Sequence, residues 1–262
     1  MLTGNQMHHF RVFGFIVLRQ LFSSDEVETI CTQADEVWTK ALGHAPAPDE
    51  SISVAPFLEL HPSLIKWIEE DRLYVPMTQL LGQDMIWSGS EGILGTTTKR
   101  TYHHWHADRP GPLELGYLRI KIMMYLEPMR KNTGALRVIP GSHRSPFHEE
   151  LMAFQQSHAI EAPDFFGVKG ADVPAYPVET DPGDLVVFNQ NLFHAVYGKV
   201  DRRRYLAWKY AARPTTDAHL SSLKKHSEYA YTPHEQLQQS HSPRIRRLID
   251  GLVEWGEQEH NL

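Results

Sequence analysis

The apolar positions in the first third of the chain recur mainly at helical spacing. One such set is Val27, Ile30, Cys31 and Ala34. These intervals place the side chains on one face of an amphipathic helix, which Ser24 and the acids after it predict to begin there. Residues 10–21 contain a β-branched apolar run that predicts a short strand, and residues 63–82 predict one or two helices interrupted near Pro76. We therefore expect residues 1–83 to be mainly helical.

The pattern changes after about residue 84. From there the chain consists of short β-rich runs punctuated by Gly, Pro and Asn, such as "GYLRIKIMMYLEP" and "GDLVVFNQNLFHAV". Several such runs without helices between them predict an all-β sandwich or barrel over residues 84–213. Residues 144–180 form a long excursion between strands, which we expect to act as a lid. Residues 214–262 predict a helical extension, and we expect the whole chain, 1–262, to form a single domain.

Composition narrows the classes of partner. The chain has 32 acidic and 26 basic residues, for a formal net charge of -6, which argues against a nucleic-acid partner. Cys31 is the single cysteine, so no intramolecular disulfide can form, as is usual in a reducing compartment. There is no signal-peptide pattern and no apolar run of membrane-spanning length. We therefore expect a cytoplasmic protein without a membrane partner that acts on a small-molecule substrate; the sequence does not indicate its oligomeric state.

The densest polar stretch is "HHWHADRP", residues 103–110. Alternate residues of an extended strand share a face, so His104, His106 and Asp108 would lie together. His106 and Asp108 could then bind one metal ion, with His104 in the pocket wall. His194, at the end of "GDLVVFNQNLFH", is the best candidate for a third ligand, because strands distant in sequence can be neighbours in a jelly roll.

Two histidines and one carboxylate on one side of a metal leave the opposite positions open. This arrangement is typical of non-haem Fe(II) oxygenases. Zinc hydrolases use the same residue types. The ligand set therefore leaves two enzyme classes open: an iron oxygenase, and a zinc or manganese cupin-like hydrolase or isomerase. A third interpretation is a non-catalytic sandwich with structural histidines, against which the complete set of three ligands argues.

An arginine pair follows on the next predicted strand, "RRRYLAWKY". Either Arg203 or Arg204 could bind a dicarboxylate through its planar guanidinium group. Strand alternation favours Arg203. An inward Arg204 would bring the bulky Leu206 and Trp208 into the cavity. Arg204 remains the alternative.

Four segments in this order resemble one enzyme family. They are "WHAD" (105–108), "GALRVIPGSH" (134–143), "GDLVVFNQNLFHAVYG" (183–198) and "RRRYLAWKY" (202–210). Together they resemble the phytanoyl-CoA dioxygenase (PhyH-like) family of Fe(II)/2-oxoglutarate-dependent oxygenases, and the opening strand and helix are similar as well, so the resemblance spans residue 10 to about 213. It implies a mainly β fold with flanking helices: a double-stranded β-helix, or cupin-like jelly roll, with the N-terminal helices packed on it.

The resemblance also implies a site and a reaction. The implied iron ligands are His106, Asp108 and His194. The arginine that binds 2-oxoglutarate would be Arg203 or Arg204, which follow the distal histidine by nine and ten residues where the family usually has about eleven. With Fe(II), 2-oxoglutarate and O2, such an enzyme would hydroxylate a small organic substrate and release succinate and CO2. Related halogenases replace the acid by a small residue, so the intact Asp108 favours hydroxylation or another oxidation over halogenation.

Two further polar positions have alternative interpretations. Lys121, on the strand "RIKIMMYLEP", could point into the barrel and contact 2-oxoglutarate or an acidic substrate, or it could lie at a solvated strand edge. Residues 140–143, "PGSH", predict a turn capped by Ser142, in which His143 is structural rather than a ligand.

Overall fold

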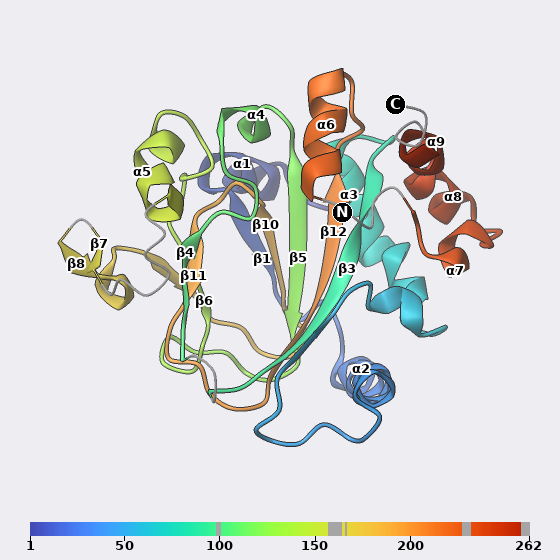
Figure 1. Cartoon of the computed structure of the whole chain (residues 1–262), viewed down its shortest axis with the longest axis horizontal. Coiled ribbons are helices and arrows are strands. Elements are labelled where there is room, and N and C mark those ends of the chain that lie inside the picture. Colours follow the sequence, from blue (N-terminus) through green and yellow to red (C-terminus); the bar gives the residue numbers. More distant parts are fainter. Residues whose placement is uncertain (98–100, 157–163, 166, 227–231, 258–262) are drawn as a thin grey trace.

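The computed structural model describes residues 1–97, 101–156, 164–165, 167–226 and 232–257 (Figure 1). The strands are β1 (Phe15–Leu18), β2 (Ile52–Val54), β3 (Ile86–Gly95), β4 (His103–His106), β5 (Arg119–Tyr125), β6 (Leu136–Val138), β7 (Asp164–Phe165), β8 (Val168–Lys169), β9 (Tyr176–Val178), β10 (Leu185–Asn189), β11 (His194–Val196) and β12 (Arg203–Ala211). The helices are α1 (Gly4–Phe13), α2 (Ser24–Leu42), α3 (Asp71–Leu81), α4 (Pro112–Leu115), α5 (Phe147–Gln156), α6 (Asp217–His226), α7 (Glu235–Gln238), α8 (Pro243–Ile249) and α9 (Leu252–Glu257). Short 3-10 helices lie at Leu58–Leu60, Ile65–Ile68 and Gly170–Asp172.

Two antiparallel sheets form the centre of the molecule. The larger has the order β1-β10-β5-β12-β3-β2, and the smaller has the order β4-β11-β6-β9. Strands far apart in the sequence are therefore neighbours, such as β5 and β12 or β4 and β11. This confirms the expected fold, a cupin-like jelly roll with flanking helices.

The outer face of the larger sheet is covered by helices. Figure 1 shows α2, α3 and α7 to α9 on the side of this sheet that is turned away from the smaller one. Residues that alternate along β5 and β12 bury their side chains there: Ile120, Ile122, Met124, Leu206, Trp208 and Tyr210. They pack in one cluster with helical residues such as Ile30, Trp38 and Met77, as strand alternation predicts. Part of the space between the two sheets is filled by a second apolar cluster that includes Phe15, Val138 and Phe188.

The N-terminal part differs from the expectation in its details. Residues 10–13 belong to α1 rather than to a strand, because Thr3 and Gln6 form a capping box and the helix runs on to Gly14 in the left-handed conformation. The cap of α2 is Ser23, one residue before the predicted Ser24. This part also supplies β1 and β2, the two edge strands of the larger sheet, so it is more than a set of packed helices.

Helix α3 continues through Pro76, where an interruption was expected. Proline removes one backbone hydrogen bond, but the apolar face of α3 is buried at Leu73, Met77 and Leu81, which outweighs that loss.

Of the excursion 144–180, residues 157–163 and 166 lie outside the described part, and its role as a lid stays a prediction. Within the described ranges, no helix combines the length and apolar character needed to cross a bilayer.

Candidate metal centre and cavity

The three residues expected to bind metal lie together between the two sheets. His106 ends β4 and is the pairing partner of His194, which begins β11, while Asp108 follows β4 in a turn. Asp108 Oδ1 is 3.6 Å from His106 Nε2 and 3.7 Å from His194 Nε2. One ligand atom of each residue lies within 4.8 Å of the others, a spacing that can hold a metal ion.

Both imidazole rings are fixed in the orientation that metal binding needs. His106 Nδ1 lies 2.8 Å from the carbonyl oxygen of His104, and His194 Nδ1 lies 2.8 Å from that of Leu192. Since a carbonyl oxygen only accepts, each Nδ1 donates, and each Nε2 keeps its lone pair for the space beside Asp108. Imidazole and carboxylate donors of this kind suit Fe(II).

Charges around the three ligands favour the protonation states that bind metal. Burial alone would raise the pKa of the Asp108 carboxyl, but the positive charge of Lys121 holds this pKa well below its ordinary value. Burial, with a contribution from His106, lowers the pKa of His194 to about 3. Asp108 is therefore ionised and His194 is neutral at neutral pH, as metal ligation requires.

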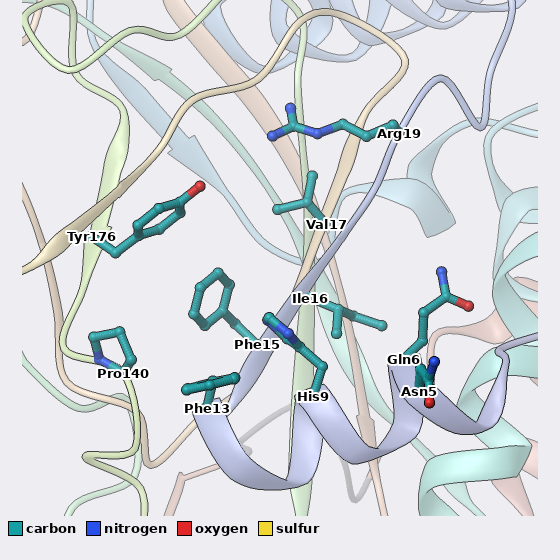
Figure 2. A pocket seen from close by; sticks show the side chains of 10 residues that line it. All are labelled: Asn5, Gln6, His9, Phe13, Phe15, Ile16, Val17, Arg19, Pro140 and Tyr176. Atoms are coloured by element: carbon teal, nitrogen blue, oxygen red, sulfur yellow. The ribbon is translucent and has the colours of Figure 1, made fainter.

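The three ligands open into a cavity of about 630 Å³ between the sheets. Its walls are Ser51, Glu91, Ile93, Gly95, Thr96, His103, His106, Asp108, Lys121, Met123, Leu136, His194, Val196, Lys199, Arg203 and Tyr205. A second hollow, of about 570 Å³, lies outside this cavity, beside β1 and β9. Figure 2 shows that Phe13, Phe15, Pro140 and Tyr176 surround it, and none of the three ligands lines it. Its Arg19 is already ion-paired with Asp184 at 2.7 Å, so we take the first cavity as the candidate active site.

The two candidate arginines point to opposite faces of β12. Arg203 lines the cavity, where its Nε donates to the carbonyl oxygen of Gly134 at 2.9 Å and its Nη2 to the hydroxyl of Tyr125 at 2.8 Å. Arg204 points outward and pairs with Glu127 at 2.7 Å and with Asp35 of α2 at 2.7 Å. Arg204 is therefore placed wrongly for binding a ligand in the cavity, because consecutive strand residues face opposite sides.

Lys121 points into the cavity, where it belongs to a chain of charges. Its Nζ lies 2.6 Å from Glu91 and 3.5 Å from Asp108 Oδ2, and the second oxygen of Glu91 lies 2.7 Å from Lys209. Lys121 and Lys209 are direct cross-strand partners, so Glu91 separates two like charges that would otherwise repel. The pairing partner of Glu91 on β12 is the small Ala207.

A bulge changes which histidines face the cavity. His106 pairs with His194, but His103 rather than His104 pairs with Val196, so β4 has one extra residue between the two pairs. His103 therefore lines the cavity, with its ring centroid 4.4 Å from that of His106. The assignment of His104 to the pocket wall is wrong, because strict alternation does not hold across a bulge.

Sequence reasoning missed Glu91 as well as His103. Glu91 is the one acid in the β3 sequence "IWSGSEGILG", where the other residues are small or apolar. This isolated charge could have indicated a functional position. An ionised side chain in such a strand is expected to have a partner nearby.

Comparisons with known proteins agree with this fold and identify the family. Over 100 residues, the chain is 28% identical to the "Dioxygenase lolE1" of Epichloe uncinata. These residues make up 38% of this chain and 35% of that protein. The fold is similar to HygX from Streptomyces hygroscopicus, solved with nickel and 2-oxoglutarate bound (18% identity, TM-score 0.66, 81% of this chain and 88% of that one). It is also similar to the non-haem alpha-ketoglutarate-dependent carbocyclase SnoK from nogalamycin biosynthesis (19% identity, TM-score 0.60, 84% and 90%). The profile of the phytanoyl-CoA dioxygenase (PhyH) family matches residues 10–199, and the chain belongs to that family.

Proposed function

We propose that this protein is an Fe(II)- and 2-oxoglutarate-dependent oxygenase that hydroxylates a small organic substrate, with release of succinate and CO2. The observation that carries the proposal is the convergence of two Nε2 lone pairs and one ionised carboxylate in a cavity that also holds a buried arginine. Fe(II), 2-oxoglutarate and O2 are the metal and co-substrates of the PhyH family. When bound, they supply the oxidation of a substrate C–H bond, which protein side chains do not perform themselves.

His106, Asp108 and His194 would hold the iron. The Nδ1–H of each histidine is anchored to a backbone carbonyl oxygen, so the rings keep their orientation as a metal enters. Lys121 lies beside Asp108 Oδ2, which leaves Oδ1, the oxygen nearer both histidines, for the metal. We assign to Lys121 the orientation of this carboxylate, in addition to contact with 2-oxoglutarate.

Arg203 would bind the distal carboxylate of 2-oxoglutarate. The bonds to Gly134 and Tyr125 hold its guanidinium group, and this group also lies 4.7 Å from the ring centroid of Tyr125 and 5.3 Å from that of Tyr205. A cation held in this way offers its remaining N–H groups at a fixed position, which favours a bidentate bond to a carboxylate. Burial of the guanidinium group with the carboxylate strengthens the bond between them, because the local dielectric constant is low.

The walls of the cavity favour a polar substrate. Glu91 and Lys121 form an ion pair directly beside the proposed iron ligands. A purely alkyl substrate would remove water from these charges without replacing its hydrogen bonds, which costs free energy. We therefore propose a substrate that carries hydroxyl, amino or carboxylate groups rather than a bare hydrocarbon chain.

Succinate release is the decisive measurement. Under anaerobic conditions, Fe(II) and 2-oxoglutarate should give a weak visible absorption band with the wild-type protein and none with Asp108→Ala. In air, polar members of a substrate panel should stimulate succinate release, while matched alkyl compounds should not. A wild-type protein that binds neither iron nor 2-oxoglutarate would contradict the proposal.

Turnover without O2, metal content and product analysis separate this proposal from the other interpretations. A zinc or manganese hydrolase or isomerase would turn over its substrate without O2 and without forming succinate. A non-catalytic sandwich would retain its metal content after mutation of His106. Because SnoK is described as a carbocyclase, the product must also be examined: hydroxylation adds one oxygen atom, whereas ring closure removes two hydrogen atoms.

A further inference from the structure

Two polar residues behind the metal site are completely buried and do not line the cavity. Ser142, in the turn after β6, and His148, in α5, both have 0% of their surface exposed. They lie next to the two segments that carry Asp108 and His194. Burial of polar side chains costs free energy unless they are hydrogen-bonded, so their partners indicate what they do.

Ser142 holds the residue that precedes His194. Its hydroxyl oxygen accepts a hydrogen bond from the backbone N–H of Phe193 at 2.9 Å. The carbonyl oxygen of Phe193 accepts from the backbone N–H of Ile139 at 2.9 Å. Both backbone polar groups of Phe193 are therefore bound to one turn, and they set where β11 begins.

His148 holds the turn that carries Asp108. Its Nδ1 lies 3.0 Å from the carbonyl oxygen of Ser142, and its Nε2 lies 3.0 Å from the backbone nitrogen of Gly111. Because the carbonyl oxygen only accepts, Nδ1 donates, and Nε2 accepts from Gly111. The ring thus joins Ser142 to a residue three positions after Asp108.

This support matters because no strand holds Asp108. The carboxylate lies in a turn after β4, and the backbone bonds that follow it are from Arg109 to the carbonyl oxygen of Gln190, at 3.0 Å, and from Gly111 to His148. The position of a carboxylate on a turn depends on how well the backbone beside it is held, and small displacements there are costly. The ring of His148 also contacts Phe193, with centroids 5.2 Å apart, so one side chain touches both segments.

We infer that Ser142 and His148 are positioning residues that fix the distance between the segment of Asp108 and the segment of His194, and thereby set metal affinity. This inference rests on the proposed function. It gives a role to the "PGSH" turn, whose serine binds Phe193 while its histidine, His143, faces the carbonyl oxygen of Arg11 on α1 at 3.2 Å. His143 therefore serves as a control with a similar environment and a different partner.

The test compares matched variants in two measurements. The variants are Ser142→Ala, His148→Leu, His148→Gln and the control His143→Leu. The first measurement is an anaerobic titration with Fe(II) in the presence of 2-oxoglutarate, followed by the visible band. The second is hydrogen exchange of the metal-free protein, followed by mass spectrometry in residues 108–112 and 190–194.

We expect Ser142→Ala and His148→Leu to weaken iron binding about 10-fold, the lower end of the loss that follows removal of a group that orients a metal ligand. His148→Gln keeps an acceptor for Gly111 and should bind iron more tightly than His148→Leu. His143→Leu should lower the melting temperature without changing iron affinity, which separates positioning from general stability. Exchange should rise in both segments for Ser142→Ala and His148→Leu only.

Equal iron affinity in His148→Leu and His143→Leu, or unchanged exchange in the two segments, would overturn the inference. Failure of the proposed function looks different, because the wild-type protein itself would then show no band. In that case the exchange measurement still decides whether Ser142 and His148 hold the two segments together.

Discussion

The two faces of the larger sheet differ in chemistry, and neighbouring residues of β12 show the difference. On the outer face, Trp208 is completely buried among apolar side chains beneath the helices, and Arg204 is neutralised by two acids. On the inner face, Arg203 and Tyr205 line the cavity, and Lys209 pairs with Glu91 of the cavity wall. One strand thus supports folding on one side and chemistry on the other, so substitutions at adjacent positions should separate stability from activity.

The largest effect is expected on the outer face. Trp208→Ala removes a fully buried aromatic side chain and should lower the free energy of unfolding by about 3–5 kcal/mol. Urea unfolding of the metal-free protein measures this change. At low temperature, the fraction that remains folded should still give the anaerobic iron and 2-oxoglutarate band, since Trp208 does not line the cavity. Loss of the band in the folded fraction would mean that the two faces are not independent.

The arginine pair provides the sharpest test of the comparison. Arg203→Met should raise the KM for 2-oxoglutarate by about 10- to 150-fold, because a hydrogen-bonded charge contributes about 1.5–3 kcal/mol. Arg204→Met should leave this KM unchanged and instead lower stability, because it leaves Glu127 and Asp35 without their partner. Steady-state succinate release at varied 2-oxoglutarate gives both KM values. A raised KM in Arg204→Met would contradict the assignment.

A smaller effect is expected at the ion pair beside the metal ligands. Lys121→Met removes the group next to Asp108 Oδ2 and should weaken Fe(II) binding about 10-fold. Lys209→Met is the matched control, because Lys209 contacts the same Glu91 from the far side. Anaerobic titration should show a clearly smaller change for the control. Equal changes would mean that Lys121 acts only through Glu91.

The smallest effect is a dependence of stability on pH. Burial alone would raise the pKa of Glu91, but Lys121 and Lys209 lower it from 4.5 to about 2. Because the folded-state pKa is the lower one, this stabilisation is complete above about pH 4.5 and is lost as the pH falls towards 2. The difference in unfolding free energy between wild type and Glu91→Gln, both metal-free, should therefore shrink between about pH 5 and about pH 3. A constant difference over that interval would show that the charge of Glu91 does not stabilise the fold.

Side-chain size and strand period were sufficient to predict the direction of Arg203. An inward Arg204 would have brought Leu206 and Trp208 into the cavity, and in the structure both are buried on the outer face. The order of the β-rich runs and the family resemblance likewise predicted the jelly roll. These features depend on local pattern, which a single sequence contains.

Features that depend on neighbouring strands could not be predicted. The bulge in β4 exists only relative to β11, so alternation selected His104 where the structure places His103 in the cavity. Glu91 and Lys121 meet only because β12 lies between β3 and β5, an order that the sequence does not state. Ser142 was expected only to cap its own turn, and the partners of Ser142 and His148 could not be predicted because they lie on distant segments.

Ala207 has a consequence for the width of the cavity wall. The strands of Glu91 and Lys121 are separated by β12, so they are two strand spacings, about 10 Å, apart. The two side chains together are long enough to cover that gap and meet at 2.6 Å, and Ala207, directly opposite Glu91 on the strand between them, adds only a methyl group there. A valine would place branched carbon atoms beside the Glu91 side chain. We therefore expect a larger side chain at residue 207 to crowd Glu91, so that a substrate would meet two separated charges of opposite sign instead of one joined ion pair.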